Sequence, residues 1–231
     1  MDKIRFGVRN LHIGTYTDSG GVITLGTGMA IPGAVHVTME PIADHAKMYA
    51  DNDIYYSAYC ENGHSGEIED ALFSDEFKCA FLNYQMDNNG KCNKLLGLNT
   101  DRVWIGFESC GDVANRRMIL YNVQLGGITR EYATEGENTQ PGTSTLPFTA
   151  YGDDDTNVGT AAFSEGDDYY ANLFTAPPSP DDLVHFPLQD EDGLDLLTND
   201  QEVIEGRVPS KYLIKLQSNQ IVQDSFNTVW I

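Results

Sequence analysis

The chain has 231 residues, of which 41% are hydrophobic and 21% are charged, which is enough to bury a core and excludes a chain disordered throughout. Asp and Glu number 35 against 14 Lys and Arg, so the net charge is −21 at pH 7. A surface this acidic argues against nucleic-acid binding through a basic patch, although a polyanion can pass along it without adhering. Between Glu131 and Glu205 there are 18 acidic residues and no Lys or Arg. That segment is either a set of solvated loops or a functional negative surface.

The cysteines predict free thiols. Cys60, Cys79, Cys92 and Cys110 lack both the spacing of a zinc knuckle and a CxxC redox motif. The first residues contain no secretory signal, and no segment approaches the ~20 apolar residues of a membrane span. We therefore expect a protein that is made in a cytoplasm, has no membrane contact, and leaves the cell by release rather than by classical secretion.

Most of residues 1–150 have the patterns of β-strands. The segment 34–40 alternates, with Val35, Val37 and Met39 on one face. Two later hairpins are expected, and their strands span 102–108 with 116–125, and 128–135 with 143–151. Pro147 cannot donate a backbone hydrogen bond to a ladder, so it predicts an edge strand or a local irregularity.

The segment 53–72 predicts a strand pair with a core face and a solvent face. The predicted core face carries Ile54, Tyr56, Ala58, Cys60, Ile68 and Leu72. The outward face carries Asp53, Tyr55, Ser57, Tyr59, Glu67 and Glu69. Asn62 and Gly63 between the two halves tolerate positive φ and predict the hairpin turn.

One short helix is expected directly after this strand pair. Ser74 is the predicted N-cap, and Asp75 and Glu76 complement the positive end of the helix dipole. Phe77 and Phe81 lie four residues apart, on one face.

The composition changes after Tyr151. Acidic, loop-like sequence leads to TAPPSPDD (175–182), which is typical of a linker. We predict a main domain over residues 1–177 and an extension or arm over 178–231, which packs on its own or a neighbouring subunit because it has too few apolar residues for a core of its own.

No metal or cofactor site is predicted. The segment 85–90 fails as an EF-hand loop, because Gln85 and Leu96 would occupy its first and last ligand positions. Asp153–Asp155 and Asp190–Asp195 can hold calcium loosely or be solvated loops. There is no HExxH, GxGxxG or GK[ST] motif.

No catalytic residues are predicted either, so we expect the protein not to be an enzyme. A GxSxG motif is absent. Cys60 beside His64 is interpreted as a buried structural thiol near a polar hairpin tip. Glu67 and Glu69 share a strand face at ~7 Å, a pairing that any solvated edge strand produces.

The tyrosines of the strand pair predict an interface. Tyr49, Tyr55, Tyr56 and Tyr59 are too many for one face to bury beside carboxylates, although Tyr56 in the core with the others on an ordinary surface is the simpler alternative. The residues predicted at a subunit interface are Tyr49, Asp51, Asp53, Tyr55, Tyr59, Asn62, Gly63, His64, Glu67 and Glu69.

Several motifs resemble the major tail protein, or tail tube subunit, of long flexible-tailed bacteriophages. They are, in order, RFGVRNLHIGTYT, IPGAV, MYADNDIYYSAYCENGHSGEIEDALFSDEF and FESCGDVANRRMILYNV. The resemblance runs over Met1–Pro177, and its most specific part is the pattern YADN…YY…NGxSGxxExAL at Tyr49–Leu72. Residues after Pro177 do not match the family pattern.

The resemblance implies a β-sandwich or barrel-like fold with one short helix, and subunits that close into hexameric rings and stack into a tube. It implies a virion tail component assembled in the host cytoplasm, whose electronegative lumen lets viral DNA pass without specific binding during ejection. Expected partners are other copies of the chain, the tape-measure protein, the tail terminator and the distal tail or baseplate proteins. A long hairpin, here 48–67, would reach a neighbouring subunit.

An alternative function is a monomeric carbohydrate-binding module of a phage tail tip or baseplate. Exposed Tyr and Trp beside carboxylates suit stacking on sugars, and Asp190–Asp195 would bind calcium.

Overall fold

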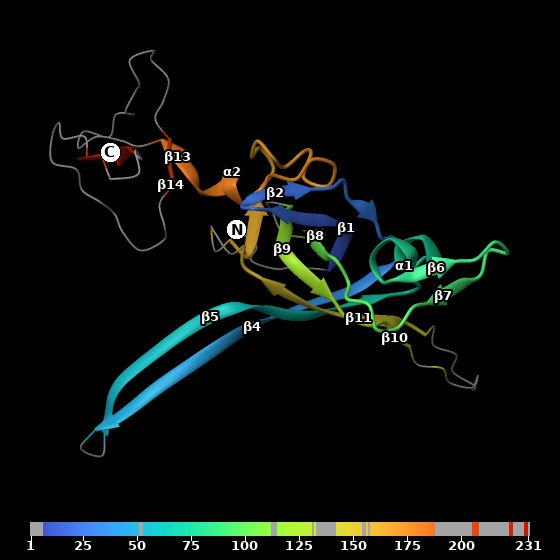
Figure 1. Cartoon of the computed structure of the whole chain (residues 1–231), viewed down its shortest axis with the longest axis horizontal. Helices are drawn as coiled ribbons and strands as arrows, with labels where there is room; N and C mark the ends of the chain where they lie inside the picture. Colours follow the sequence, from blue (N-terminus) through green and yellow to red (C-terminus); the bar gives the residue numbers. More distant parts are fainter. Residues whose placement is uncertain are drawn as a thin grey trace, which may run out of the picture. The chain divides into compact units, whose positions relative to one another are not determined.

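The fold is mainly β, as the sequence predicts (Figure 1). The computed structural model describes residues 7–50, 53–111, 115–130, 132, 142–153, 156, 158–187, 205–207, 222–223 and 229–230. The chain divides into two compact units, Met1–Pro180 and Asp181–Ile231. The predicted assignment of 178–231 to an extension stays a prediction.

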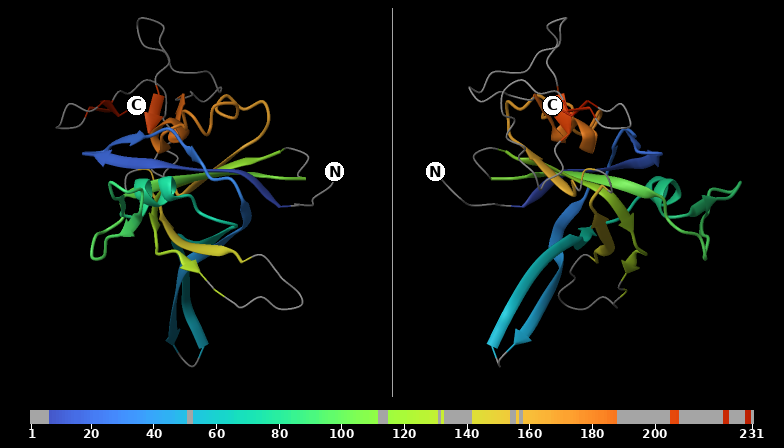
Figure 2. Two further views of the ribbon diagram at one scale, coloured as in Figure 1. Left: turned by 90° about the vertical axis from the view of Figure 1, so that its right-hand side faces the viewer. Right: turned by 60° about the vertical axis from the view of Figure 1, so that its left-hand side comes forward.

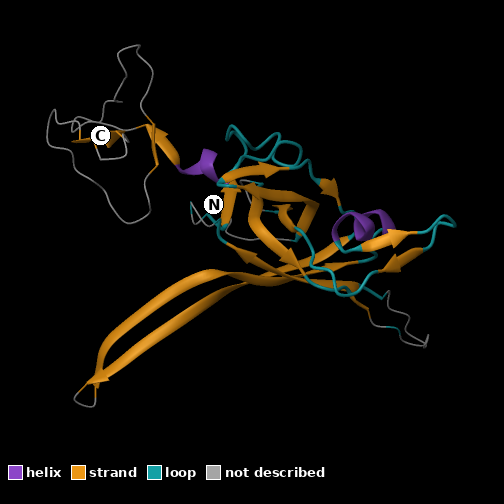
Figure 3. Ribbon diagram, in the orientation of Figure 1, coloured by secondary structure: helices purple, strands orange, loops and turns teal. Residues whose placement is uncertain are grey.

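One antiparallel sheet makes up most of the first unit (Figure 3). Its main path runs β2-β1-β8-β9-β11-β5-β4, with β3 on β1, β10 on β11 and β12 on β9. The strands are β1 (Val8–Ser19), β2 (Val22–Leu25), β3 (Met29–Ala30), β4 (Ala34–Ala50), β5 (Asp53–Asp70), β8 (Arg102–Ser109), β9 (Arg117–Leu125), β10 (Thr129–Arg130), β11 (Ser144–Tyr151) and β12 (Thr160–Phe163).

Strand β8 is buried on both faces and marks the centre of the sheet. Val103 and Ile105 belong to the main hydrophobic core. Trp104, between them, is fully buried on the opposite face, where its Nε1 donates to Gly26 O at 2.9 Å. Because alternate residues of a strand point to opposite faces, a strand buried at every position needs a covering layer on each side.

The segment 164–178 supplies the second covering layer. Phe174 is buried, and its carbonyl oxygen accepts from Gly28 N at 3.0 Å. Tyr121 Oη, on β9, donates to Pro178 O at 3.0 Å. Pro178, inside the segment 175–182 predicted as a linker, is buried, and the two compact units divide after Pro180 within the same segment.

The predicted helix is confirmed as α1 (Asp75–Phe81). Ser74 Oγ caps it by accepting from Phe77 N at 3.1 Å, and Phe77 and Phe81 face the core. The short strands β6 (Tyr84–Met86) and β7 (Cys92–Lys94) pair directly after it. A second, five-residue helix, α2 (Pro180–Val184), was not expected.

The two later hairpins also form. Strands β8 and β9 pair over most of their length, and β10 pairs with β11 at Thr129–Thr145 and Arg130–Ser144. Residues 131 and 133–135 of the predicted strand lie outside the described residues. The edge position predicted for Pro147 is wrong, because β11 lies between β9 and β5. The Pro147 carbonyl accepts from Gly126 N at 2.8 Å, in the gap between the pairing of β11 with β10 and with β9. The missing N–H of proline is thus tolerated where the ladder is interrupted.

The described parts of the second unit are short. Strand β13 (His185–Pro187) pairs with β14 (Glu205–Arg207), and β15 (Val222–Gln223) pairs with β16 (Val229–Trp230). The predicted calcium segment Asp190–Asp195 lies outside the described residues.

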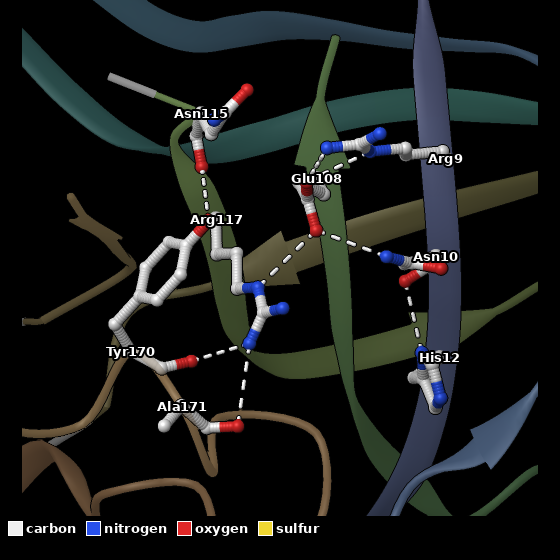
Figure 4. Close-up of polar contacts among 8 residues, drawn as sticks. All are labelled: Arg9, Asn10, His12, Glu108, Asn115, Arg117, Tyr170 and Ala171. Atoms are coloured by element: carbon white, nitrogen blue, oxygen red, sulfur yellow. Dashed lines mark hydrogen bonds and ion pairs between the residues drawn. The ribbon is translucent and has the colours of Figure 1, made fainter. Parts of the chain in front are cut away.

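Glu108 ties three parts of the first unit together (Figure 4). This β8 carboxylate is 2% exposed and accepts from Arg9 and Asn10 of β1 and from Arg117 of β9. Burial alone would raise the pKa of Glu108, but these hydrogen bonds outweigh it and hold the pKa below its usual value. Arg117 in turn lies 4.2 Å from the Tyr170 ring centroid, which links β9 to the covering segment.

Replacing Glu108 with Gln is expected to lower the free energy of unfolding by about 2 kcal/mol, because the mostly buried Arg117 loses its counter-charge, whereas Arg9 is more than half exposed and contributes less. The folded-state pKa is lowered, so this stabilisation is present above the ordinary Glu pKa of 4.5 and is lost as pH falls through the lower folded value. Urea unfolding of both proteins at pH 7 and pH 3 measures it, with the exposed Glu40→Gln as control. An unchanged difference at pH 3 would contradict the ionic origin.

Asp70, at the end of β5, has the opposite behaviour. It is fully buried, its Oδ1 accepts from Leu72 N at 2.8 Å, and within the described chain its Oδ2 has no hydrogen-bond partner. Burial raises the pKa of Asp70, and the Leu72 hydrogen bond offsets only part of that rise.

Asp70→Asn is therefore expected to stabilise the protein at pH 8 by roughly 1 kcal/mol, since the amide keeps the Leu72 contact without burying a charge. The ionised Asp70 destabilises the fold only as pH rises through its raised folded pKa, so the gain should vanish below the ordinary value of 3.8. Thermal unfolding of both proteins at pH 3.5 and pH 8 checks this, and an equal gain at both pH values would refute it.

Candidate subunit interface

The longest hairpin of the protein continues beyond the sheet that supports it. Strands β4 and β5 pair from Ala34–Asp70 to Ala50–Asp53, but β11 pairs with β5 only from Gly63 to Asp70. Residues 43–50 and 53–62 therefore form a two-stranded arm, and no described strand pairs beside it. At the antiparallel rise, eight residues of β4 make the arm about 27 Å long. Figures 1 and 2 show it projecting away from the other strands of the first unit.

The arm leaves the sheet at a β-bulge. Ile42 pairs with Gly63 and Ala43 with Glu61, so Asn62 is an extra residue on β5. Gly63 has φ +146°, and a Cβ atom there would lie 2.4 Å from Ala150 O of β11. The hairpin turn predicted at Asn62-Gly63 is wrong: the chain reverses between Ala50 and Asp53. The permissive backbone that suggested a turn instead permits the bulge and the close approach of β11.

Asn62 also stabilises the bulge through its side chain. Its Nδ2 donates to Asp44 Oδ2 across the strand pair at 2.8 Å, and the Cys60 thiol lies 3.3 Å from its Oδ1. His64, the next polar residue of β5, has its Nε2 3.1 Å from Glu61 Oε1. The base of the arm is thus held by local polar contacts.

Both faces of the arm are open to solvent. Ile54 and Tyr56, predicted to face the core, are 49% and 58% exposed, and Cys60, predicted to be buried, is exposed. These predictions are wrong because no layer of the described chain covers this part of the hairpin. Tyr55 and Tyr59, predicted to face outward, are also mostly exposed. A register shift between Met48 and Tyr49 places Ile54 and Tyr56 on opposite faces, so the single face predicted for these two residues is wrong.

Closer to the sheet, the predictions hold in part. Ile68, Val37 and Met39 pack in or against the core. Val35 is exposed because the register shifts between Ala34 and His36. Leu72 is exposed because the strand ends at Asp70, and Phe73 enters the core instead.

The predicted interface residues fall into three places. Asp53, Tyr55 and Tyr59 lie on the arm, Asn62, Gly63 and His64 lie at its base, and Glu67 and Glu69 lie where β5 runs between β4 and β11. The backbone of Tyr49 pairs with Ile54 on the arm, and Asp51 lies outside the described residues. Fourteen residues separate Asp53 from Glu67, roughly 48 Å of strand, so the two carboxylates do not share one surface.

Sequence reasoning missed a second exposed apolar surface. A groove of about 260 Å³ lies between the segment 94–100 and the segment 124–128. On its rim the segment 95–98, here called the leucine loop, exposes Leu95, Leu96 and Leu98. Asn83, at φ +57°, anchors this loop by donating from Nδ2 to Asn99 O at 2.9 Å. The sequence signal was KLLGL at 94–98, three leucines with no strand or helix to bury them.

The described chain contains no group of three His, Cys, Asp or Glu that could bind a metal ion. Asp153, of the predicted calcium segment Asp153–Asp155, is buried and accepts from Tyr16 Oη at 3.0 Å and from Thr156 N at 2.8 Å, a structural role. The four cysteines are free thiols, as predicted. Among the described residues, no helix has the length and apolar character needed to cross a membrane.

Adding a methyl group at Gly63 tests how the arm joins the sheet. Gly63→Ala is expected to lower the free energy of unfolding by roughly 3 kcal/mol, because the new Cβ meets Ala150 O and L-residues disfavour this φ. Gly166→Ala is the matched control, since Gly166 has φ +107° and open space around it. Urea unfolding measures both variants, and equal losses would show that contact with β11 is unimportant.

Comparison with known proteins yields few matches. No protein-family model matches this chain, and no curated protein does. Among solved structures, it is similar to a chain of the sheath–tube complex of an extracellular contractile injection system, PVC, in its extended state: the TM-score is 0.40 and the identity 8%, over 67% of this chain and 88% of that chain. It is also similar to the tube-terminating cap of the anti-feeding prophage, with a TM-score of 0.42 and 6% identity over 71% of this chain and 95% of that one. Scores this low carry no argument about function, which has to come from the chain's own residues.

Proposed function

We propose that this chain is a structural subunit that assembles with copies of itself into the tube of a phage-like tail. The observation that carries the proposal is the arm: a two-stranded ribbon whose exposed residues on both faces include tyrosines and aliphatic side chains. It coincides with the most specific part of the resemblance to tail tube subunits, Tyr49–Leu72.

The exposed, two-stranded arm is expected to be more stable when it binds a partner chain. An isolated two-stranded hairpin is marginally stable in water, and its unpaired edges can bind another chain. Tyrosines supply large contact area with a polar hydroxyl and are enriched where protein surfaces meet. The described body of the first unit does not cover the arm, because the pairing of β11 with β5 ends at Gly63 of β5.

A repeating contact of this kind builds a closed ring or an open helical assembly. In the proposed tube, six subunits form a ring and the rings stack. The net charge of −21 suits a conduit through which DNA travels during ejection, because Lys and Arg contacts with phosphate would retain it. The chain would then be part of a virion tail, assembled in the host cytoplasm with the tape-measure, terminator and distal tail proteins.

The role proposed is not catalytic, and the carbohydrate-binding alternative gains no support from a particular observation. Trp104, one of the two tryptophans, is fully buried and unavailable for stacking on a sugar. The tyrosines Tyr55 and Tyr59 lie on a projecting arm rather than in a cleft.

Two substitutions on the arm test the proposal. The wild-type protein is expected to form rings or hollow tubes at high concentration, visible by negative-stain microscopy. Tyr55→Ser with Tyr59→Ser should raise the concentration needed for assembly by about 30-fold, the equivalent of roughly 2 kcal/mol of lost contact. Light scattering after gel filtration measures the mass of each species.

The matched control is Tyr132→Ser, which removes a tyrosine that is 86% exposed and lies outside the arm, and it should assemble like the wild type. A wild-type protein that stays monomeric under all assembly conditions would overturn the proposal. Binding to a glycan array that is lost on Tyr55→Ala would favour the carbohydrate alternative instead.

A further inference from the structure

We propose that the arm of one copy docks into the groove beside the leucine loop of the next copy. This inference rests on the proposed function and deepens it, because it names the surface that receives the arm. It follows from three features: where the exposed apolar residues gather, how the charges are distributed, and where the two surfaces lie.

The exposed apolar residues of the described chain gather in two places. Of 16 large hydrophobic residues that are exposed, five lie on the arm and three lie in the leucine loop. On the arm they are Met48, Ile54, Tyr55, Tyr56 and Tyr59; in the leucine loop they are Leu95, Leu96 and Leu98. Leu96 is 84% exposed, and no described segment covers this apolar loop, which is unfavourable in water. Burying each cluster against the other removes both from water.

The groove can accept side chains from the arm. Its lining includes the buried Leu82 and Leu125, the leucine loop and Ile128. Its volume of about 260 Å³ is below the roughly 300–1,000 Å³ of small-molecule pockets, so side chains of the arm rather than the whole ribbon would enter it. Backbone contacts at both ends hold the loop, since Leu95 N donates to Asn83 O at 3.0 Å and Asn83 Nδ2 donates to Asn99 O. A site held in this way does not need to reorganise to bind.

The charges of the two surfaces are complementary. The described residues of the arm carry Asp44, Asp53 and Glu61 against Lys47, a net charge of −2. Lys94 is exposed and is the charged residue in the lining of the groove, 5.8 Å from the Tyr84 ring centroid. Lys91 is exposed nearby, but so are Asp87 and Asp101, so the attraction of the groove for the acidic arm rests on Lys94.

The location of the two surfaces requires two copies. Within the first unit, the arm projects from one side, whereas α1, β6 and β7 lie on the other in the views of Figures 1 and 2. Tyr84 of β6 and Lys94 of β7 belong to the lining of the groove. The β4–β5 ladder carries the arm away from the groove of its own chain. The contact is therefore heterologous, with a different surface from each copy, and it repeats from copy to copy until a ring closes or an open assembly grows.

This asymmetry gives a sharp experiment. The arm variant Tyr55→Ser, Tyr59→Ser keeps an intact groove, and the groove variant Leu96→Ser, Leu98→Ser keeps an intact arm. Each variant alone is expected to need about 30-fold higher concentration to associate. An equimolar mixture should form a heterodimer of twice the subunit mass that does not grow further, because only one intact arm–groove pair exists. Light scattering after gel filtration reads the mass, and thermal unfolding confirms that both variants are folded.

The control and the contrary outcomes are well separated. Val22→Ser replaces an equally exposed apolar residue on β2 and should assemble like the wild type. A folded groove variant that assembles like the wild type would overturn this inference and leave the proposed function standing, as would a mixture that yields no heterodimer. A wild-type protein that never assembles would overturn the proposed function itself.

A charge exchange tests the same contact without removing apolar surface. Lys94→Glu should weaken association about tenfold, and Asp53→Lys alone should do the same. Combining both changes in one chain should restore association, because each arm then meets a groove of opposite charge. A combined variant as weak as the two single changes added together would show that Asp53 and Lys94 do not face each other.

Discussion

Strand β11 pairs with β5 only as far as Gly63 of β5, and this end of the pairing decides which part of the hairpin is exposed. As far as Gly63, β5 lies between β4 and β11, and its inward residue Ile68 is buried. Beyond it, the same two strands continue without a covering layer, so alternation no longer separates a dry face from a wet one. The bulge at Asn62 and the close approach of Ala150 to Gly63 mark the point where the covered part of the hairpin ends and the arm begins.

The body of the first unit is built so that the arm need not contribute to its stability. Strand β8 is buried on both faces, and Glu108 joins β1, β8 and β9 through charged hydrogen bonds. Arg117 extends the same network to the segment that covers the second face. Residues on the arm and the leucine loop are free to serve association, because replacing them removes little buried area from the folded monomer.

Predictions from the sequence succeeded where the signal was local. Ser74 caps α1 because a serine oxygen three residues ahead of a free N–H meets the same geometry in any protein. The pairing of β8 with β9 follows from two apolar segments joined by a short connection. Predictions failed where a partner distant in sequence decided the outcome: Tyr56 and Cys60 share a face, but whether that face is covered depends on where the pairing of β11 with β5 ends.

The sequence by itself determined the mainly β class, the free thiols, the helix cap and the choice of Tyr49–Leu72 as the segment to look at for an interface. These depend on composition, period and short-range geometry, which the order of residues contains. Only the tertiary structure decided that Asn62-Gly63 is a bulge rather than a turn, that Pro147 lies inside the sheet, and that the leucine loop and the arm lie on different sides of the unit. The physical reason is that burial, register and the spacing of surfaces are properties of pairs of segments, and neither member of a pair carries them alone.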